Sequence, residues 1–235
     1  GKQRDHSSAL RNGICESLVI LSVYGDTLFK DRLGISMESQ ITVLIRKMLT
    51  PLTIQTLQSH DLDLPHYAEA APSEFLRIIE EDLRSESPVV LGLLKPVDGG
   101  AIFGSPSRTG ILWGLECIAW NPWHFPRVVL ILAQLSKYKI DDNWVNKPVN
   151  SLQALFRSWL PQTAASLDQR INTLETLVER YPDIGWEVCM EQIRLNSTIG
   201  HYAYRPRWRN DASGAGQVAT INENNGFVKR CVELL

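Results

Sequence analysis

The densest group of residues that could do chemistry lies in one short segment, 201–209. Three arginines alternate there with three aromatic residues, namely Tyr202, Tyr204, Arg205, Arg207, Trp208 and Arg209. Guanidinium groups beside aromatic rings can stack on single-stranded bases and grip phosphates, or form the energetic centre of a protein interface. The same residues can instead strap an extended loop onto helices through cation–π contacts and ion pairs. All three interpretations stay open, and these six are the candidate interaction residues.

A second group with chemical potential is the loop that contains His60, Asp61, Asp63 and His66. Two imidazoles and two carboxylates could bind a divalent ion. However, no two histidines of the chain have the i, i+4 spacing that points both rings at one metal from a helix. Such a composition is also common in surface turns, so we expect no metal site.

The glycine-rich segment 99–107 is the only candidate for a phosphate cradle. A P-loop also needs the triplet Gly-Lys-Ser/Thr at the start of a helix, and that triplet does not occur. Ser105 lacks the Gly-x-Ser-x-Gly context of a hydrolase nucleophile. The sequence therefore predicts a flexible loop or hairpin turn for this segment, and we expect neither a cofactor nor a catalytic residue.

Composition describes a chain with a large core and no obvious partner. The 235 residues are 44% hydrophobic and carry a formal net charge of −2. That balance lacks the basic excess of a nucleic-acid-binding protein, because counterion release needs several uncompensated cations. No apolar run approaches the length that crosses a bilayer, so no membrane association is expected. The four cysteines form no Cys-x-x-Cys pair, which favours free buried thiols and a cytoplasmic location.

Apolar residues at spacings of three and four predict a succession of short helices. Leu10, Ile14, Leu18, Leu21 and Leu28 mark one face of the first helix. Serines at 7 or 8, 36, 73 and 166 suit N-caps. The predicted helices cover about 6–28, 36–49, 73–83, 110–120, 124–137, 151–160, 166–180 and 183–193.

Helices of this number and spacing stack in pairs rather than winding around a sheet. Trp113 and Trp186 each precede a Glu and a Cys, but no fixed repeat period emerges. The only β candidate is the apolar run 89–94, which could be a strand of a small hairpin near 88–104 or a helical turn. The prediction is an all-α fold, an irregular α-α superhelix with solenoid-like stacking. It forms a single segment 1–235, with a sub-division into 1–86 and 109–235 around the Gly/Pro-rich loop left open.

Several segments of packing type carry a family resemblance: 7–21, 119–133, 148–163, 182–186 and 205–209. Together they resemble the helical region of very large bacterial STAND-type NTPases of antiviral defence, of the AVAST kind. In that family an N-terminal effector precedes a P-loop NTPase and a long helical-repeat part, which recognises a viral protein and drives oligomerisation. The resemblance implies a protein-binding sensor or scaffold, with any ATPase or effector outside these residues.

The expected function is therefore a non-enzymatic interaction module of a larger bacterial ATP-binding protein. Its partners would be a protein, viral under the resemblance, and the flanking domains of the parent chain, which could also bring oligomers together. Contact would come from a concave helical surface and the loops 86–108 and 195–217. Because the chain opens on Gly1 and ends in the apolar-periodic run 227–235, we expect an excised segment. The alternative is a nucleic-acid- or nucleotide-binding fragment of an enzyme that uses residues 201–209.

Overall fold

A computed structural model describes residues 7–97, 106–193 and 202–235. Helices dominate these ranges and no strand occurs within them, which confirms the all-α prediction. The α-helices are α1 (Ser8–Leu33), α2 (Met37–Leu49), α3 (Ile54–Ser59), α4 (Leu64–Ala70), α5 (Pro72–Leu83), α6 (Thr109–Ala119), α7 (Phe125–Ser136), α8 (Pro148–Leu155), α9 (Leu167–Arg180), α10 (Pro182–Ile193) and α11 (Ile221–Leu234), with short 3₁₀ helices η1 (Val89–Leu94) and η2 (Asn210–Ala212).

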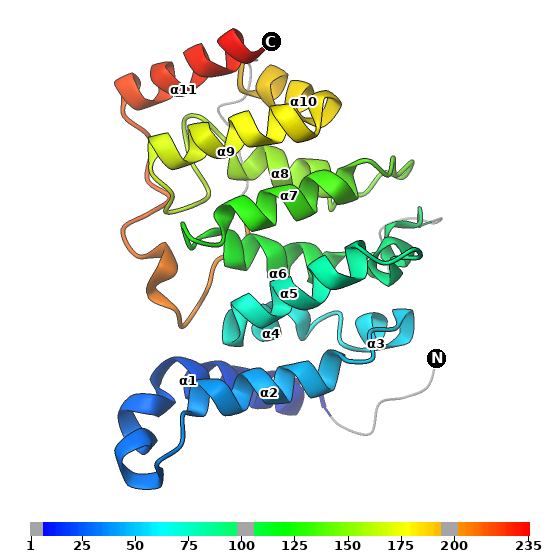
Figure 1. Ribbon diagram of the computed structural model, residues 1–235, viewed down its shortest axis with the longest axis vertical. Coiled ribbons are helices and arrows are strands. Elements are labelled where there is room, and N and C mark those ends of the chain that lie inside the picture. Colours follow the sequence, from blue (N-terminus) through cyan, green and yellow to red (C-terminus); the bar gives the residue numbers. More distant parts are fainter. Residues whose placement is uncertain (1–6, 98–105, 194–201) are drawn as a thin grey trace.

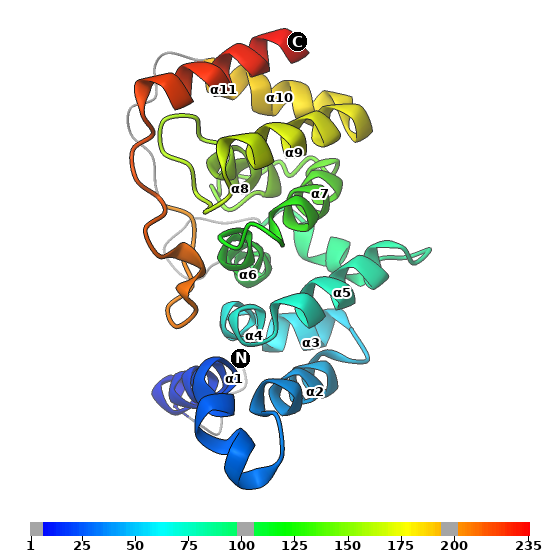
Figure 2. The same ribbon diagram turned by 60° about the vertical axis from the view of Figure 1, so that its left-hand side comes forward.

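The helices stack in two layers along the long axis of the molecule (Figures 1 and 2). In the first layer α1, α4, α6, α8 and α10 each contact the next, and in the second layer α2, α5, α7, α9 and α11 do the same. Contacts between α1 and α2, α4 and α5, α6 and α7, and α10 and α11 join the layers. The architecture is the solenoid-like α-α superhelix that the sequence predicts.

The helix boundaries follow from local capping chemistry. The side chains of Ser7, Ser36 and Ser166 each accept a backbone N–H in the first turn of the helix that follows. Ser166 and Gln169 form a complete capping box. The expected cap at Ser73 is wrong, since α5 begins one residue earlier with Pro72 and has no side-chain cap. A proline suits that position because the first-turn N–H has no helical partner.

Residues 89–94 form the 3₁₀ helix η1, so the helical turn is confirmed there and the strand of a hairpin near 88–104 is wrong. The Asp82 carboxylate at the end of α5 accepts the N–H groups of both Val89 and Val90 at 2.9 Å. These bonds start a tight helical turn directly after Pro88 and bury Val90 and Leu93. The remainder of the predicted hairpin, 98–105, lies outside the described residues.

Aromatic and aliphatic side chains fill the space between the layers. The rings of Phe125, Phe156 and Phe227 contact one another in series and connect α7, the end of α8 and α11. All four cysteines are buried and free, as expected. Within the described ranges, no helix combines the length and the apolar character that crossing a membrane requires.

An ion-pair cluster joins α2 to α5 in the second layer. The buried carboxylate of Glu74 accepts hydrogen bonds from the guanidinium groups of Arg77 and Arg46, with Nε–O distances of 2.9 and 2.6 Å. These two partners, Arg77 before Arg46, lower the pKa of Glu74 to about 2. Glu74 therefore stays ionised at every physiological pH and holds the two helices in register.

The apolar face predicted for the first helix is only partly covered. Cys15, Val19, Ser22 and Gly25 are the buried positions of α1, whereas Leu10 and Ile14 remain about half exposed. At the opposite end of the stack, α11 exposes Ile221 and Val232. Both ends of the stack consequently present apolar side chains to solvent.

Candidate functional site

The candidate interaction residues belong to an extended segment, 202–219, which we term the strap. It follows α10 and precedes α11, yet it runs back beside the first layer toward α1 (Figures 1 and 2). Buried side chains of α4 and of the loop between α8 and α9 accept its backbone N–H groups. Gln162 accepts from Ala203 at 3.0 Å, and Glu69 accepts from both Trp208 and Arg209 at 2.5 and 2.9 Å. The strap is thus bound as a peptide by the surface that it crosses.

Tyr204 and Arg205 anchor the strap on α6. The Tyr204 ring stacks on the Trp113 ring with a centroid separation of 5.5 Å. The backbone carbonyl of Tyr204 accepts a hydrogen bond from the indole N–H of Trp120 at 3.0 Å. The Arg205 guanidinium lies 4.4 Å from the centroid of the Trp120 ring. Gly216 completes this contact with a φ of 69°, where a Cβ would approach the Trp120 ring to 2.9 Å. This corner therefore requires a glycine.

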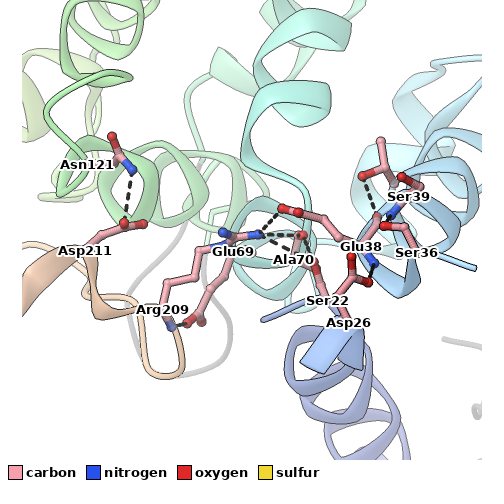
Figure 3. Close-up of polar contacts among 11 residues, drawn as sticks. Ser22, Asp26, Ser36, Glu38, Ser39, Glu69, Ala70, Asn121, Arg209 and Asp211 are labelled. Carbon is pink, nitrogen blue, oxygen red and sulfur yellow. Dashed lines mark hydrogen bonds and ion pairs between the residues drawn. The ribbon is translucent and has the colours of Figure 1, made fainter. Parts of the chain in front are cut away.

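Arg209 anchors the middle of the strap on α4 (Figure 3). Its Nε donates to the carbonyl of Glu69 at 2.6 Å, and its Nη2 donates to the carbonyl of Ala70 at 3.2 Å. Nη2 also lies 3.3 Å from a carboxylate oxygen of Glu38 in α2. Nearby, the Asn121 amide donates to the Asp211 carboxylate at 3.0 Å. A single guanidinium therefore ties the strap to both layers.

Arg207 and Trp208 bind less deeply. Arg207 pairs with Glu16 of α1, but its side chain remains 67% exposed. The Trp208 carbonyl accepts the Tyr24 hydroxyl at 3.0 Å, while its buried indole N–H has no partner among the described residues. Tyr202 is the exception of the six, since it is 62% exposed and makes no hydrogen bond within the described part of the chain.

Tyr202 borders a groove of about 530 Å³ between α6, α8 and α10. We term it the aromatic groove and define it by Trp113, Asn146, Gln153, Trp159 and Tyr202. The side-chain amides of Asn146 and Gln153 form no hydrogen bond in the described ranges, so both can serve a ligand. The groove combines apolar rings with unused donors and acceptors, which is the usual composition of a binding pocket.

A part-buried carboxylate, Glu116, lies at the inner edge of this groove. It accepts the Ser151 hydroxyl at 2.5 Å and the backbone N–H of Tyr204 at 2.8 Å. Burial raises its pKa, and the two hydrogen bonds oppose that effect. Because its oxygens are already used, Glu116 positions α8 and the strap rather than a ligand.

The loop around His60 and His66 has a structural role in the described fold. Asp63 pairs with Arg11 of α1, and Asp61 accepts the backbone N–H of Gly110 at 2.8 Å. The Tyr67 hydroxyl lies 3.0 Å from Nδ1 of His60. No group of three side chains that could hold a metal ion occurs among the described residues. The loop joins α1, α4 and α6.

Sequence reasoning did not identify the residues that hold the strap, above all Glu69, Glu116, Trp120 and Gln162. A signal did exist for the two acids, because Glu69 lies between Ala68 and Ala70, and Glu116 between Leu115 and Cys117. A charged residue inside an apolar helical run needs a partner when it is buried. His201, and the parts of the predicted contact loops at 98–105 and 194–201, lie outside the described residues.

Comparisons with protein-family models, with curated proteins and with solved structures gave no match. The resemblance to STAND-type NTPases therefore depends on the sequence segments quoted above, and no relative assigns a role to the strap or to the aromatic groove.

Proposed function

We propose that this chain is a non-catalytic protein-interaction module, a sensor or scaffold within a larger bacterial ATP-binding protein. Under the STAND-type resemblance its partner is a viral protein, bound in the cytoplasm. The aromatic groove carries the proposal. Rings of Trp and Tyr are over-represented at the energetic centres of protein interfaces, because they bury much area at little cost in conformational entropy.

The apolar ends of the stack support a role within a longer helical assembly. Solenoid proteins normally need terminal repeats with a polar outer face. Here Leu10 and Ile14 at one end, and Ile221 and Val232 at the other, are exposed instead. Further helices of a parent chain would bury these side chains, as neighbouring helices within each described layer bury one another's apolar side chains.

No observation favours the alternative of a nucleic-acid- or nucleotide-binding fragment. That function would need the strap guanidinium groups to face a ligand. Arg205 instead donates to the carbonyls of Ala212 and Ala215 and covers Trp120, and Arg209 is bound by α4. Arg207 projects largely into solvent and pairs with Glu16.

The proposal is tested by comparing two ligand classes on the same purified chain. A library of random peptides displayed on phage is selected against it, and single-stranded DNA and RNA are titrated by fluorescence anisotropy at about 50 and 200 mM salt. We expect the selection to enrich peptides whose affinity depends little on salt. Tight nucleic-acid binding that falls steeply with salt and is lost in Arg207→Ala, with no peptide enriched, would overturn the proposal.

A further inference from the structure

We propose that the aromatic groove binds an extended peptide segment of the partner protein through one large apolar side chain. That side chain inserts among Trp113, Trp159 and Tyr202, while the amides of Asn146 and Gln153 hydrogen-bond the peptide backbone. The inference rests on the proposed protein-interaction function and names the site and the form of the partner.

The strap shows how this surface recognises an extended chain. Its backbone N–H groups are accepted by side-chain oxygens of Gln162, Glu116 and Glu69, and its Tyr204 ring lies on Trp113. Side chains, rather than a sheet edge, satisfy the peptide backbone here. A primary amide is suited to the same task because it offers one acceptor and two donors to a peptide group.

The groove continues the track of the strap. Trp113 contributes to both, since it stacks on Tyr204 and also lines the groove. Ala203, whose N–H is bound by Gln162, lines the groove as well. A second extended segment would therefore lie on the same layer, over α8 and α10 and beside Tyr202 and Ala203 of the strap.

The electrostatics of the groove suit an uncharged segment. Its charged lining consists of Arg157, Glu191 and the inner Glu116, whose oxygens already accept two hydrogen bonds. The first two contribute one charge of each sign at the α8–α10 side. A phosphate backbone or a strongly acidic peptide would find no cationic excess, whereas aromatic rings and neutral amides match an apolar side chain and its flanking peptide groups.

The test uses two variants that remove groove contacts without touching the core. Tyr202→Ala deletes a ring that is 62% exposed, and Gln153→Ala deletes an amide that has no hydrogen bond to any described residue. Tyr138→Ala and Trp186→Ala are the matched controls, because these rings are 49% and 52% exposed and lie outside the groove. Random twelve-residue peptides selected on the native chain are synthesised with a fluorescent label and titrated by anisotropy. Circular dichroism verifies that each variant is folded.

We expect the selected peptides to share one Trp, Phe or Leu position, and the Kd to rise at least tenfold in Tyr202→Ala and severalfold in Gln153→Ala. Both control variants should bind within twofold of the native chain. Peptides that bind Tyr202→Ala and Gln153→Ala normally but lose affinity in Trp186→Ala would refute the groove and leave the interaction function standing. Failure to enrich any peptide would refute the groove as a peptide site, and together with tight, salt-sensitive nucleic-acid binding it would also overturn the interaction function.

Discussion

Replacing Arg209 by alanine distinguishes a structural strap from a free interaction loop. The Arg209 side chain is only 20% exposed and donates to the carbonyls of Glu69 and Ala70. Arg207, two residues away, is 67% exposed and, among the carboxylates that the structure describes, pairs with Glu16 alone. The two arginines have the same chemistry in different surroundings, so each is the natural control for the other.

The expected magnitude follows from the contacts that each variant removes. Hydrogen bonds to a charged group contribute about 1.5–3 kcal/mol each when they are shielded from water. Ala70 keeps the Ser22 hydroxyl as a donor at 2.6 Å, so the carbonyl of Glu69 is the main group affected. Arg209→Ala should therefore cost about 2–3 kcal/mol. Arg207→Ala removes a surface ion pair and should cost at most about 1 kcal/mol.

Urea titration and thermal unfolding followed by circular dichroism measure this difference. For a chain of this length a loss of 2–3 kcal/mol lowers the Tm by roughly 4–10 °C. Hydrogen exchange supplies an independent readout, since the amides of Trp208 and Arg209 should lose protection when the strap loosens. Equal effects of the two variants, or unchanged exchange in Arg209→Ala, would refute the structural account of the strap.

Further predictions concern buried carboxylates and one close helix contact. Because its two arginine partners hold the Glu74 pKa at about 2, this carboxylate stabilises the fold above about pH 4.5, and that stability is lost as the pH falls toward 2. Glu74→Gln should therefore cost about 1–2 kcal/mol at neutral pH in urea titration, with the difference shrinking in acid. Burial raises the Glu116 pKa, so its stabilising contribution is present at low pH and is lost as the pH rises. The stability of Glu116→Gln relative to the native chain should rise between about pH 4 and pH 7, and a constant difference would contradict this reasoning. A Cβ on Gly110 would lie 1.7 Å from the carbonyl oxygen of Asp61, so Gly110→Ala should cost more than about 2 kcal/mol, whereas Gly13→Ala, with open space around it, should gain about 0.5–1 kcal/mol.

Helix positions were largely predictable because their signals are local. Ser36 and Ser166 begin helices as expected, and the Asn121-Pro122 corner separates α6 from α7. The predicted helix 151–160 was placed too late, since α8 runs from Pro148 to Leu155. A proline that opens a helix and one that ends it look alike in a single sequence.

The candidate site was predictable only in its residue types. The alternation of arginines and rings in 202–209 identified a segment that uses cation–π contacts and ion pairs. Its partners could not be inferred, because Trp208 meets Glu69 across 139 positions and Arg209 meets Glu38 across 171. The groove was missed for the same reason, since Tyr202 and Gln153 come together only after the helices have stacked.

The return path of the strap changes the mechanics of the whole stack. A helical solenoid with contacts only between neighbours behaves as a spring, and its ends peel away first. Here Tyr24 in α1 donates to the carbonyl of Trp208, 184 positions away, which closes most of the chain into a ring. Pulling α1 and α2 from the stack must therefore also break the contacts of Tyr24, Glu16 and Glu38 with the strap. Under force or denaturant, the two ends should come apart in one concerted step, and the strapped side should resist stretching more than the opposite side.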